Sequence, residues 1–357
     1  MLNFILRRLG LMLLTAFCLT FIVFFLTNLE PNLEKLAKEQ NNMRMTDEQV
    51  LSWLQKNGYR DPLLSRYGQW LGFVPGWTGF DEDNEKMTGR CVRRLVDEAD
   101  TPSYCGVIQG EWGFSTVFRE EVSDIISKRL GATGWLMLWV MITMVPMALI
   151  IGVLAGMREG TKLDRSLSTF SIVTTATPEY VSGVLFIVLF ASSQYGLSPL
   201  FLESGTILKG SAASAIKSIT IQNFTLPVLT MALYGLGYIA RMTRASMAEV
   251  MTAQYIRTAT LKGVSFRVVV LKHALRNALI APFTVIMLQF PWLLTGVVIV
   301  ETLFNYKGFG WVLVKAASNN DIETLLGCSV VAVIVVLLTQ LISDVGYVYL
   351  NPRIRVK

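Results

Sequence analysis

The residues that could support catalysis are few, and their spacing does not suit it. His273 is the only histidine, which excludes the HExxH motif and most zinc sites. Gly160-Thr161-Lys162 is the nearest fragment to a phosphate-binding loop, but it lacks the rest of that pattern. Gly235-x-Gly237-x-x-Ala240 matches a dinucleotide fingerprint by letter, yet no strand precedes it and helix packing through small residues explains it better. We expect no catalytic site, metal or cofactor in this chain.

The most distinctive charged feature of the sequence is a cationic segment. Residues 252–279 carry five Lys/Arg and no acid, although they lie between two strongly apolar runs. Residues 249–262 suit a helix, Gly263 suits its left-handed cap, and Ser265 can start a second helix. The apolar positions of that second helix are predicted to share one side, opposite Lys272 and Arg276: Val264, Val268, Leu271 and Leu275. Such a loop either binds a partner or only fixes the membrane topology and contacts anionic headgroups.

Two polar residues interrupt the apolar runs and are candidates for a substrate pathway. A charge facing lipid costs at least about 2.5 kcal/mol, so an intramembrane carboxylate is expected to face a pathway or to be paired within the protein. Glu179, directly after Pro178, either lines a pathway or is paired structurally with a neighbouring helix or subunit. Gln289, close to Pro291, marks a place where the helix can be irregular.

The elements that must position these residues are membrane helices. The chain is 52% hydrophobic and only 16% charged, with a mean hydropathy of +0.48, which is too apolar for an ordinary soluble domain. Uncharged runs of about 20 residues match the thickness of a bilayer. They are continuously apolar, which excludes a β-barrel. We predict six spans, at residues 9–29, 134–156, 170–191, 224–240, 279–300 and 325–347.

The orientation of the spans follows from the short connections. Most of their Lys and Arg residues fall on the side that also holds both termini, and this side is therefore predicted to be cytoplasmic. Residues 241–278 form the cytoplasmic loop between the fourth and fifth spans. The net charge of +6 reflects this topology and gives no support for nucleic-acid binding.

Residues 30–133, between the first and second spans, are predicted to be a folded external loop. Thr46 and Gln49 form a capping box for a short helix that Gly58 ends, with Val50, Leu51 and Leu54 on its apolar side. Cys91 and Cys105 lie here, either joined in a disulfide or as two free thiols.

Residues 255–279 (YIRTATLKGVSFRVVVLKHALRNAL) resemble the EAA loop of binding-protein-dependent ABC importer permeases, in the dipeptide/oligopeptide/nickel branch. In this branch the EAA triplet commonly reads Arg-Thr-Ala, as Arg257-Thr258-Ala259 does, and a glycine follows at the position of Gly263. The first helix of the loop is the coupling helix.

Further motifs extend the resemblance along essentially the whole chain. They are Asp61-Pro62-Leu63 with Tyr67 and Trp70, GEWGFS (residues 110–115), RLGAT (129–133), ETLFNYKGFG (301–310), and Asp344 and Tyr347 with the terminal NPRIR (351–355). Gly131 and Lys307 stand where proline is usual, which affects local turn geometry. The external loop is longer than is typical and has two added cysteines, which leaves the docking partner and the substrate open.

The resemblance implies an all-α membrane protein formed as a single transmembrane domain over residues 1–357. It implies a permease subunit of an importer in a bacterial inner membrane, paired with a second homologous permease in a pseudo-two-fold heterodimer. Two cytoplasmic ATPase subunits would bind the ATP and Mg²⁺, and an external binding protein would deliver the substrate, with peptides favoured.

The residues that resemble the coupling helix are expected to contact the ATPase. With Thr258 as part of the same motif, Arg257 and Lys262 would supply polar contacts, Ala259 a close approach and Gly263 the corner. The alternative function is an ion-coupled secondary transporter, but one central carboxylate and no clear internal repeat argue against it.

Overall fold

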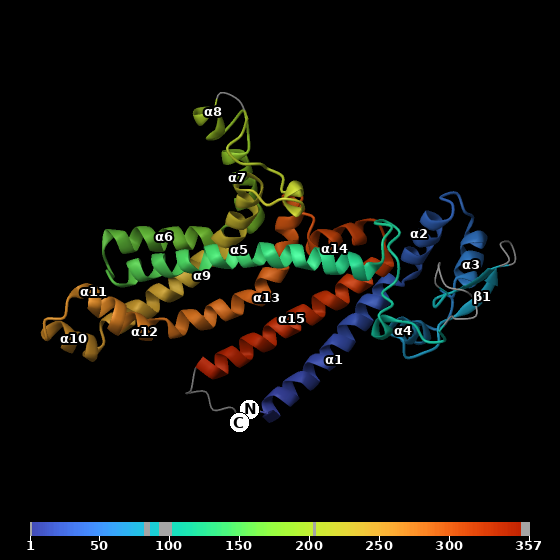
Figure 1. The fold of residues 1–357 in the computed structure, drawn as a ribbon, viewed down its shortest axis with the longest axis horizontal. Helices are drawn as coiled ribbons and strands as arrows, with labels where there is room; N and C mark the ends of the chain where they lie inside the picture. Colours follow the sequence, from blue (N-terminus) through green and yellow to red (C-terminus); the bar gives the residue numbers. More distant parts are fainter. Residues whose placement is uncertain (1, 82–85, 93–101, 203–204, 351–357) are drawn as a thin grey trace. The chain divides into compact units, whose positions relative to one another are not determined.

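Helices make up most of the chain in the computed structural model, which describes residues 2–81, 86–92, 102–202 and 205–350 (Figure 1). The first half contains α1 (Leu2–Thr27), α2 (Glu30–Gln40), α3 (Asp47–Lys56), α4 (Leu63–Leu71), η2 (Val107–Gln109), α5 (Val122–Gly156), α6 (Lys162–Ala176) and α7 (Glu179–Phe190). The second half contains α8 (Ser198–Phe201), η3 (Ala213–Ile216), α9 (Ile221–Met251), α10 (Gln254–Leu261), α11 (Phe266–Val268), η4 (Val269–Ala274), α12 (Leu275–Ala278), α13 (Ile280–Leu303), α14 (Phe309–Ser318) and α15 (Ile322–Leu350).

Four of the described helices are long and apolar enough to cross a membrane: α1, α5, α9 and α15. Two bent pairs raise the number to six if each pair is one span, namely α6 with α7, and the segment 266–278 with α13. The chain is therefore a helical membrane protein with four to six candidate spans within the described residues.

One short hairpin departs from the predicted all-α fold. β1 (Thr78–Asp81) pairs antiparallel with β2 (Lys86–Gly89), with Thr78 opposite Gly89 and Asp81 opposite Lys86. The strands have four residues each, which is too short to produce the alternating pattern by which a strand is recognised in a sequence.

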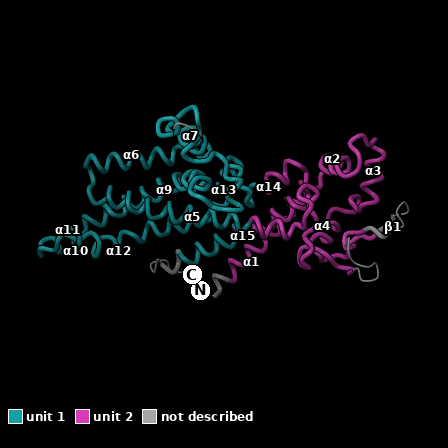
Figure 2. Tube along the Cα trace, turned by 45° about the horizontal axis from the view of Figure 1, so that its top comes forward, with its two compact units in different colours: residues 1–5, 130–311, 336–357 teal, residues 6–129, 312–335 magenta. Residues whose placement is uncertain are grey.

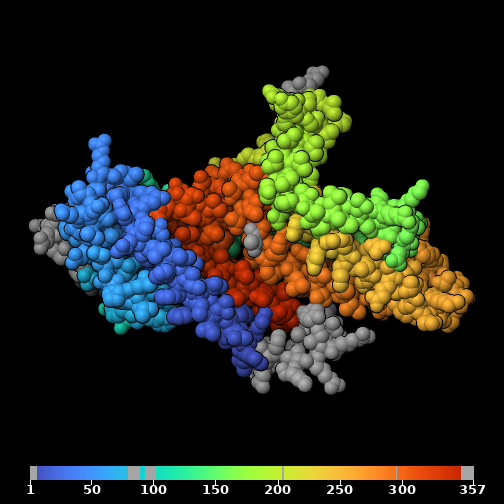
Figure 3. Space-filling model, turned by 180° about the vertical axis from the view of Figure 1, so that it is seen from behind, coloured from blue at the N-terminus to red at the C-terminus, as the bar shows by residue number. Residues whose placement is uncertain are grey.

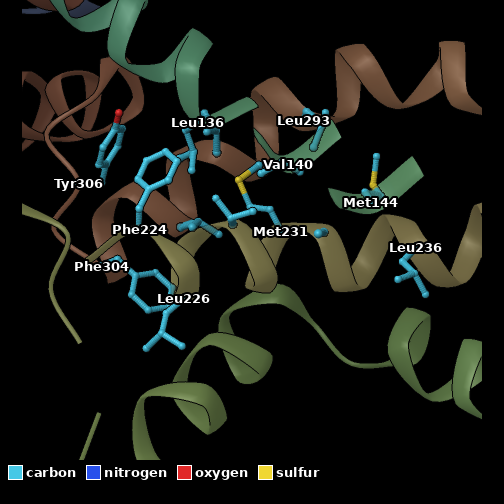
Figure 4. Close-up of a cluster of buried hydrophobic side chains, with 14 of the residues drawn as sticks. Leu136, Val140, Met144, Phe224, Leu226, Met231, Leu236, Leu293, Phe304 and Tyr306 are labelled. Carbon is cyan, nitrogen blue, oxygen red and sulfur yellow. The ribbon is translucent and has the colours of Figure 1, made fainter. Parts of the chain in front are cut away.

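The chain divides into two compact units, shown in separate colours in Figure 2: unit 1 (residues 1–5, 130–311 and 336–357) and unit 2 (residues 6–129 and 312–335). In unit 1, α9 is the central helix, and α6, α7 and α13 pack on it. Its core joins buried side chains of α5, α9 and α13, among them Met144, Met231 and Leu293 (Figure 4). Gly235 faces Met144 and Gly237 faces the Ser171 carbonyl, so both glycines serve helix packing.

The sequence predicts one continuous span over residues 170–191, but the structure has two helices there. α6 and α7 meet at an angle of 107°. Thr177, between them, is extended with ψ 120°, because the ring of Pro178 disfavours a helical conformation in the preceding residue. Pro178 also has no N–H with which to continue the helical hydrogen bonds. Glu179 is therefore the first residue of α7.

Unit 2 has its own aromatic core. Tyr67 and Trp70 of α4 are buried against Phe24 of α1, and the Tyr67 hydroxyl lies 2.8 Å from the Thr20 hydroxyl oxygen. Cys91 and Cys105 form a disulfide in this unit.

The predicted capping box is confirmed at the start of α3 in unit 2. Thr46 and Gln49 each accept a hydrogen bond from the other's backbone N–H, and Gly58 ends the helix with φ 71°. Val50 and Leu54 are buried as predicted, but Leu51 is exposed. The buried side of this short helix is therefore narrower than its apolar positions suggest.

Candidate functional site

The cationic loop folds as a short helix, a glycine corner and a second helical segment. The predicted single helix over residues 249–262 is wrong, because α9 ends at Met251, Ala253 is extended, and α10 begins at Gln254. Gly263 adopts a φ of 78°. The Gly263 N–H donates to the Thr260 carbonyl (3.0 Å), and the Val264 N–H donates to the Ala259 carbonyl (3.2 Å). These two bonds form a Schellman motif. The predicted glycine corner is confirmed, and residues 252–268, which we call the α10 corner, lie at one end of unit 1 (Figure 3, gold to orange).

The inner side of α10 packs within unit 1. Ile256 and Ala259 are buried in a cluster with Met247, Val269 and residues of η4 and α12. Ala259 is only 9% exposed. Its small side chain therefore lets α10 approach this chain's own helical segments, in contrast to the expected close approach to a partner. Ile256 and Ala259 share this side because residues three apart face the same way on a helix.

The second helical segment is not the regular helix that the sequence predicts. η4 is a π-helical stretch between α11 and α12. A π-helical turn holds more residues than an α-helical turn, so it shifts the side chains that follow around the axis. Val269, Val270 and Ala274 are consequently buried, whereas Leu271 is 65% exposed. The predicted apolar side is therefore wrong for Val268 and Leu271, which are exposed, whereas Val264 packs against the buried cluster.

The outer side of the α10 corner combines cations with exposed apolar groups. Arg257, Thr258 and Lys262 are all exposed. Leu261, directly before Lys262, is 81% exposed, and Phe266 is also exposed. Apolar side chains gathered on a surface and bordered by polar residues are typical of a protein-binding site. The sequence gives no sign that Leu261 faces outward, because an apolar residue at the end of a short helix fits an inward position equally well.

Two side-chain hydrogen bonds connect α10, α12 and α9. Asn277 of α12 donates through Nδ2 to the Tyr255 hydroxyl of α10 (2.9 Å). Ser246 of α9 donates through Oγ to the Ala278 carbonyl (2.9 Å). α10 is therefore linked to α12, and α12 is linked to α9.

A charged contact near the end of α9 was missed by sequence reasoning. Arg244 of α9 donates through Nε and Nη2 to the two carboxylate oxygens of Asp164 in α6, at 2.7 and 2.8 Å. Asp164 also accepts from the Gly160 N–H (2.9 Å) and the Ser168 hydroxyl (3.1 Å), and is buried. We call this bidentate contact the Asp164–Arg244 clamp. Its partners lie 80 positions apart, so no local pattern pairs them.

A hollow of about 610 Å³ opens in unit 1 between α6, α9 and α13. Tyr234 stacks on Trp292 with 4.6 Å between ring centroids, and the Arg241 guanidinium lies 6.0 Å from the ring centroid of Tyr238. These four side chains line the hollow together with Gln289, one of the two residues predicted for a substrate pathway. Aromatic faces with a few polar groups are the usual lining of a small-molecule site.

Glu179, the other residue predicted for the pathway, lies apart from the lining of this hollow. Its Oε1 is 3.4 Å from the position that a Cβ on Gly296 would occupy. Gly296 follows Gln289 by two turns of α13, so Glu179 and Gln289 lie along the same side of this helix without meeting. α13 itself continues through Pro291.

Two of the family-like motifs meet in unit 1. Glu301, which is fully buried, accepts hydrogen bonds from the Thr133 hydroxyl and from the Trp311 N–H (2.9 Å for the latter). Thr133 accepts in turn from the Phe309 N–H (2.8 Å), and the Tyr306 hydroxyl donates to the Ala132 carbonyl (2.8 Å). The RLGAT and ETLFNYKGFG segments thus hold each other, and we call residues 301–311 the Glu301 turn.

The motifs in unit 2 are also structural. Ser115 of GEWGFS is buried and donates to the Asp321 carboxylate (2.5 Å), which also accepts from the Thr324 hydroxyl (2.9 Å) at the start of α15. Tyr67 and Trp70 belong to the core described above. The terminal NPRIR segment, residues 351–355, lies outside the described residues, so its predicted role stays a prediction.

Comparisons with known proteins agree with the resemblance. Residues 148–356 match the family described as binding-protein-dependent transport system inner membrane component. The chain is 30% identical to the di/tripeptide transport system permease protein DppB of Pseudomonas aeruginosa (strain UCBPP-PA14), over 99% of each chain. It is 34% identical to the glutathione transport system permease protein GsiC of Escherichia coli (strain K12), over 70% of this chain and 76% of that one. A solved structure titled "Crystal structure of an amino acid ABC transporter with histidines" aligns at 14% identity and a TM-score of 0.45, covering 63% of this chain and 94% of the other.

Proposed function

Because the chain belongs to the family of binding-protein-dependent transport system inner membrane components, we propose that it forms half of a translocation pathway for short peptides. It is a permease subunit of an ABC importer, a transport component of the inner membrane that works with ATPase and solute-binding partners. The printed names of its relatives, which refer to di/tripeptides and glutathione, support short peptides as the substrate class.

The hollow beside α9 is the proposed part of the pathway within this subunit. Arg241 offers a partner for a peptide carboxylate, Gln289 offers an amide for a peptide bond, and the stacked Tyr234 and Trp292 offer apolar faces. A volume of about 610 Å³ is within the range of small-molecule sites. Glu179 extends the polar side of α13 and would attract a peptide ammonium. A second homologous permease would cover the open side, giving a pseudo-two-fold heterodimer.

The α10 corner is the proposed contact with the ATPase. Arg257, Thr258, Leu261 and Lys262 would enter a groove on that subunit, and Gly263 and Ala259 would set the position of α10 against its own chain. ATP and Mg²⁺ would bind only to the ATPase subunits. The Asp164–Arg244 clamp and the Ser246 hydrogen bond would pass the movement of the corner to α6 and α9.

The proposed membrane layout places this corner in the cytoplasm. Six spans, with each bent helix pair counted as one span, would leave both termini in the cytoplasm and residues 30–133 outside. The outer segment would then meet the solute-binding protein.

The observation that carries the proposal is the exposed Leu261 on a corner anchored to α9. The test uses the importer reconstituted in liposomes with its second permease, ATPases and binding protein, in a chain whose exposed Cys18 is replaced by Ser. Leu261→Cys should crosslink to a cysteine in the ATPase groove, and labelled dipeptide should enter only with ATP. Leu64→Cys is the matched control, because Leu64 is a similarly exposed leucine in unit 2. No crosslink from Leu261→Cys would refute the coupling role. Uptake driven by an ion gradient without ATPases would establish a secondary transporter.

A further inference from the structure

Unit 2 contains a small polar cavity that the transport mechanism does not use. Its volume is about 160 Å³, and it lies among α1, α3, α4, the residues after β2 and the first turn of α15. Its lining includes Trp70, Arg90 and Glu323. All of the lining residues belong to unit 2.

Three buried polar atoms on this lining have no hydrogen-bond partner among the described residues: Nε1 of Trp70, Nε of Arg90 and Oε2 of Glu323. Buried polar groups are nearly always satisfied, so each such atom calls for a partner. Trp70 is 1% exposed and cannot reach bulk water. The three atoms comprise two N–H donors and one carboxylate acceptor, and the residues that carry them line one cavity.

An Arg90–Glu323 ion pair stands in the lining of the cavity. The side chains of these residues are 19% and 29% exposed, and Nη1 of Arg90 lies 3.5 Å from Oε1 of Glu323. Trp53 and Tyr59, stacked with 5.8 Å between centroids, form an aromatic part of the lining. Burial, followed by the negative charge of Glu323, raises the pKa of Tyr59, so its hydroxyl stays protonated. An ammonium group is attracted to aromatic faces of this kind.

The chemistry and the volume together define the ligand. The two N–H donors suit an anionic or carbonyl oxygen, and the Glu323 carboxylate beside the aromatic rings suits an ammonium group. A cavity of about 150 Å³ accommodates a molecule of benzene size. A single small amino acid fits this volume, whereas a dipeptide of the transported class is too large. The site is therefore distinct from the pathway in unit 1.

We propose that this cavity binds a free α-amino acid of about the size of alanine, with its carboxylate on the Trp70 and Arg90 N–H groups and its ammonium on Glu323. The bound molecule would join α4 to the first turn of α15 and so stabilise unit 2, since a ligand that binds only the folded state stabilises it by mass action.

The test measures binding to the full chain, paired with its second permease in nanodiscs, by calorimetry and by intrinsic tryptophan fluorescence. L-Alanine should bind saturably. N-acetyl-L-alanine, L-alaninamide and Ala-Ala should each bind at least about tenfold more weakly, because each loses a charge-assisted hydrogen bond or exceeds the cavity. Equal binding of the acetylated or amidated compound, or no response to alanine, would overturn the proposal and leave water as the partner of these atoms.

Substitutions of two lining residues test whether alanine binds in this cavity. Glu323→Gln keeps the shape and removes the charge, and Trp70→Phe removes the N–H donor. Each should weaken alanine binding about tenfold or more in calorimetry, while monodisperse elution confirms folding. Glu120→Gln is the matched control, since Glu120 is in unit 2 but pairs with Lys128 on the surface (3.1 Å). A loss as large in this control as in Glu323→Gln would refute the assignment. ATP-driven peptide uptake without any alanine binding would refute this inference and leave the transport function intact.

Discussion

The α10 corner and the Glu301 turn both carry motifs of the same family. The motif side chains of the corner are mostly exposed, whereas Glu301 in the turn is buried. In the corner, Arg257, Leu261 and Lys262 are exposed, whereas Ile256 and Ala259 are buried. In the turn, Glu301 is fully buried, and its carboxylate holds Thr133 and the backbone of Trp311.

This difference shows that a family motif can serve either partner binding or folding. A side chain that faces outward contributes little to folding and acts when a partner arrives. A buried carboxylate that satisfies several donors contributes to folding whether or not a partner is present. Substitutions in the two regions should therefore affect folding and transport in opposite proportions.

The largest loss of stability is expected in the Glu301 turn. Glu301→Ala leaves the Trp311 N–H and the Thr133 hydroxyl without their acceptor, which we expect to cost about 4 kcal/mol of the free energy of unfolding. Denaturant unfolding in detergent micelles measures it. Glu249→Ala, at an exposed glutamate of α9, should stay within about 0.5 kcal/mol. Equal stability of the two variants would break the contrast between the two regions.

The Asp164–Arg244 clamp should show an intermediate loss. Asp164→Ala leaves the Arg244 guanidinium, whose side chain is 29% exposed, with only the more distant Glu159 (3.6 Å), at a cost of about 2 to 3 kcal/mol. The variant should also lower the peptide transported per ATP hydrolysed. A double-mutant cycle with Arg244→Ala measures the coupling between the two residues, and a coupling energy near zero would exclude the clamp.

A smaller loss is expected at the glycine of the α10 corner. Gly263→Ala places a Cβ on a residue with φ 78°, where strain of about 1 kcal/mol is expected although no neighbouring atom lies within 4 Å of the new group. Thermal unfolding compares it with Gly131→Ala, which has equally open space but no left-handed backbone and should lose nothing. A similar loss in both would show that the corner does not depend on backbone conformation.

The smallest effect on stability, with a large effect on transport, is expected at Leu261. Leu261→Ala should change the free energy of unfolding by less than about 0.5 kcal/mol, because the side chain is 81% exposed. Binding of the ATPase should weaken about tenfold if Leu261 is an anchor of the interface. Pull-down affinity and uptake measure this, with Leu64→Ala as the control. Unchanged ATPase affinity would place the contact elsewhere on the corner.

Features that depend on a few neighbouring residues could be predicted well. The capping box of Thr46 and Gln49 and the left-handed Gly263 both follow from local backbone rules, and both are confirmed. The resemblance to ABC importer permeases also held, because it rested on several motifs in the right order. The buried side of the second loop segment could not be predicted, because the π-helical stretch of η4 shifts the faces and its sequence carries no mark of it.

The sequence by itself determined that this protein lies in a membrane, that it is mostly helical, and where the chain turns at Pro178 and Gly263. These properties depend on the length of apolar runs and on proline and glycine, which act within a few residues. Only the tertiary structure decided the rest: that Asp164 meets Arg244, that Glu301 meets Thr133, and that Ala259 faces inward while Leu261 faces outward. It also decided that three residues with polar atoms lacking a hydrogen-bond partner among the described residues line one cavity. The physical reason is that these relations depend on how distant helices pack, and helix periodicity says which residues share a side without saying what that side contacts.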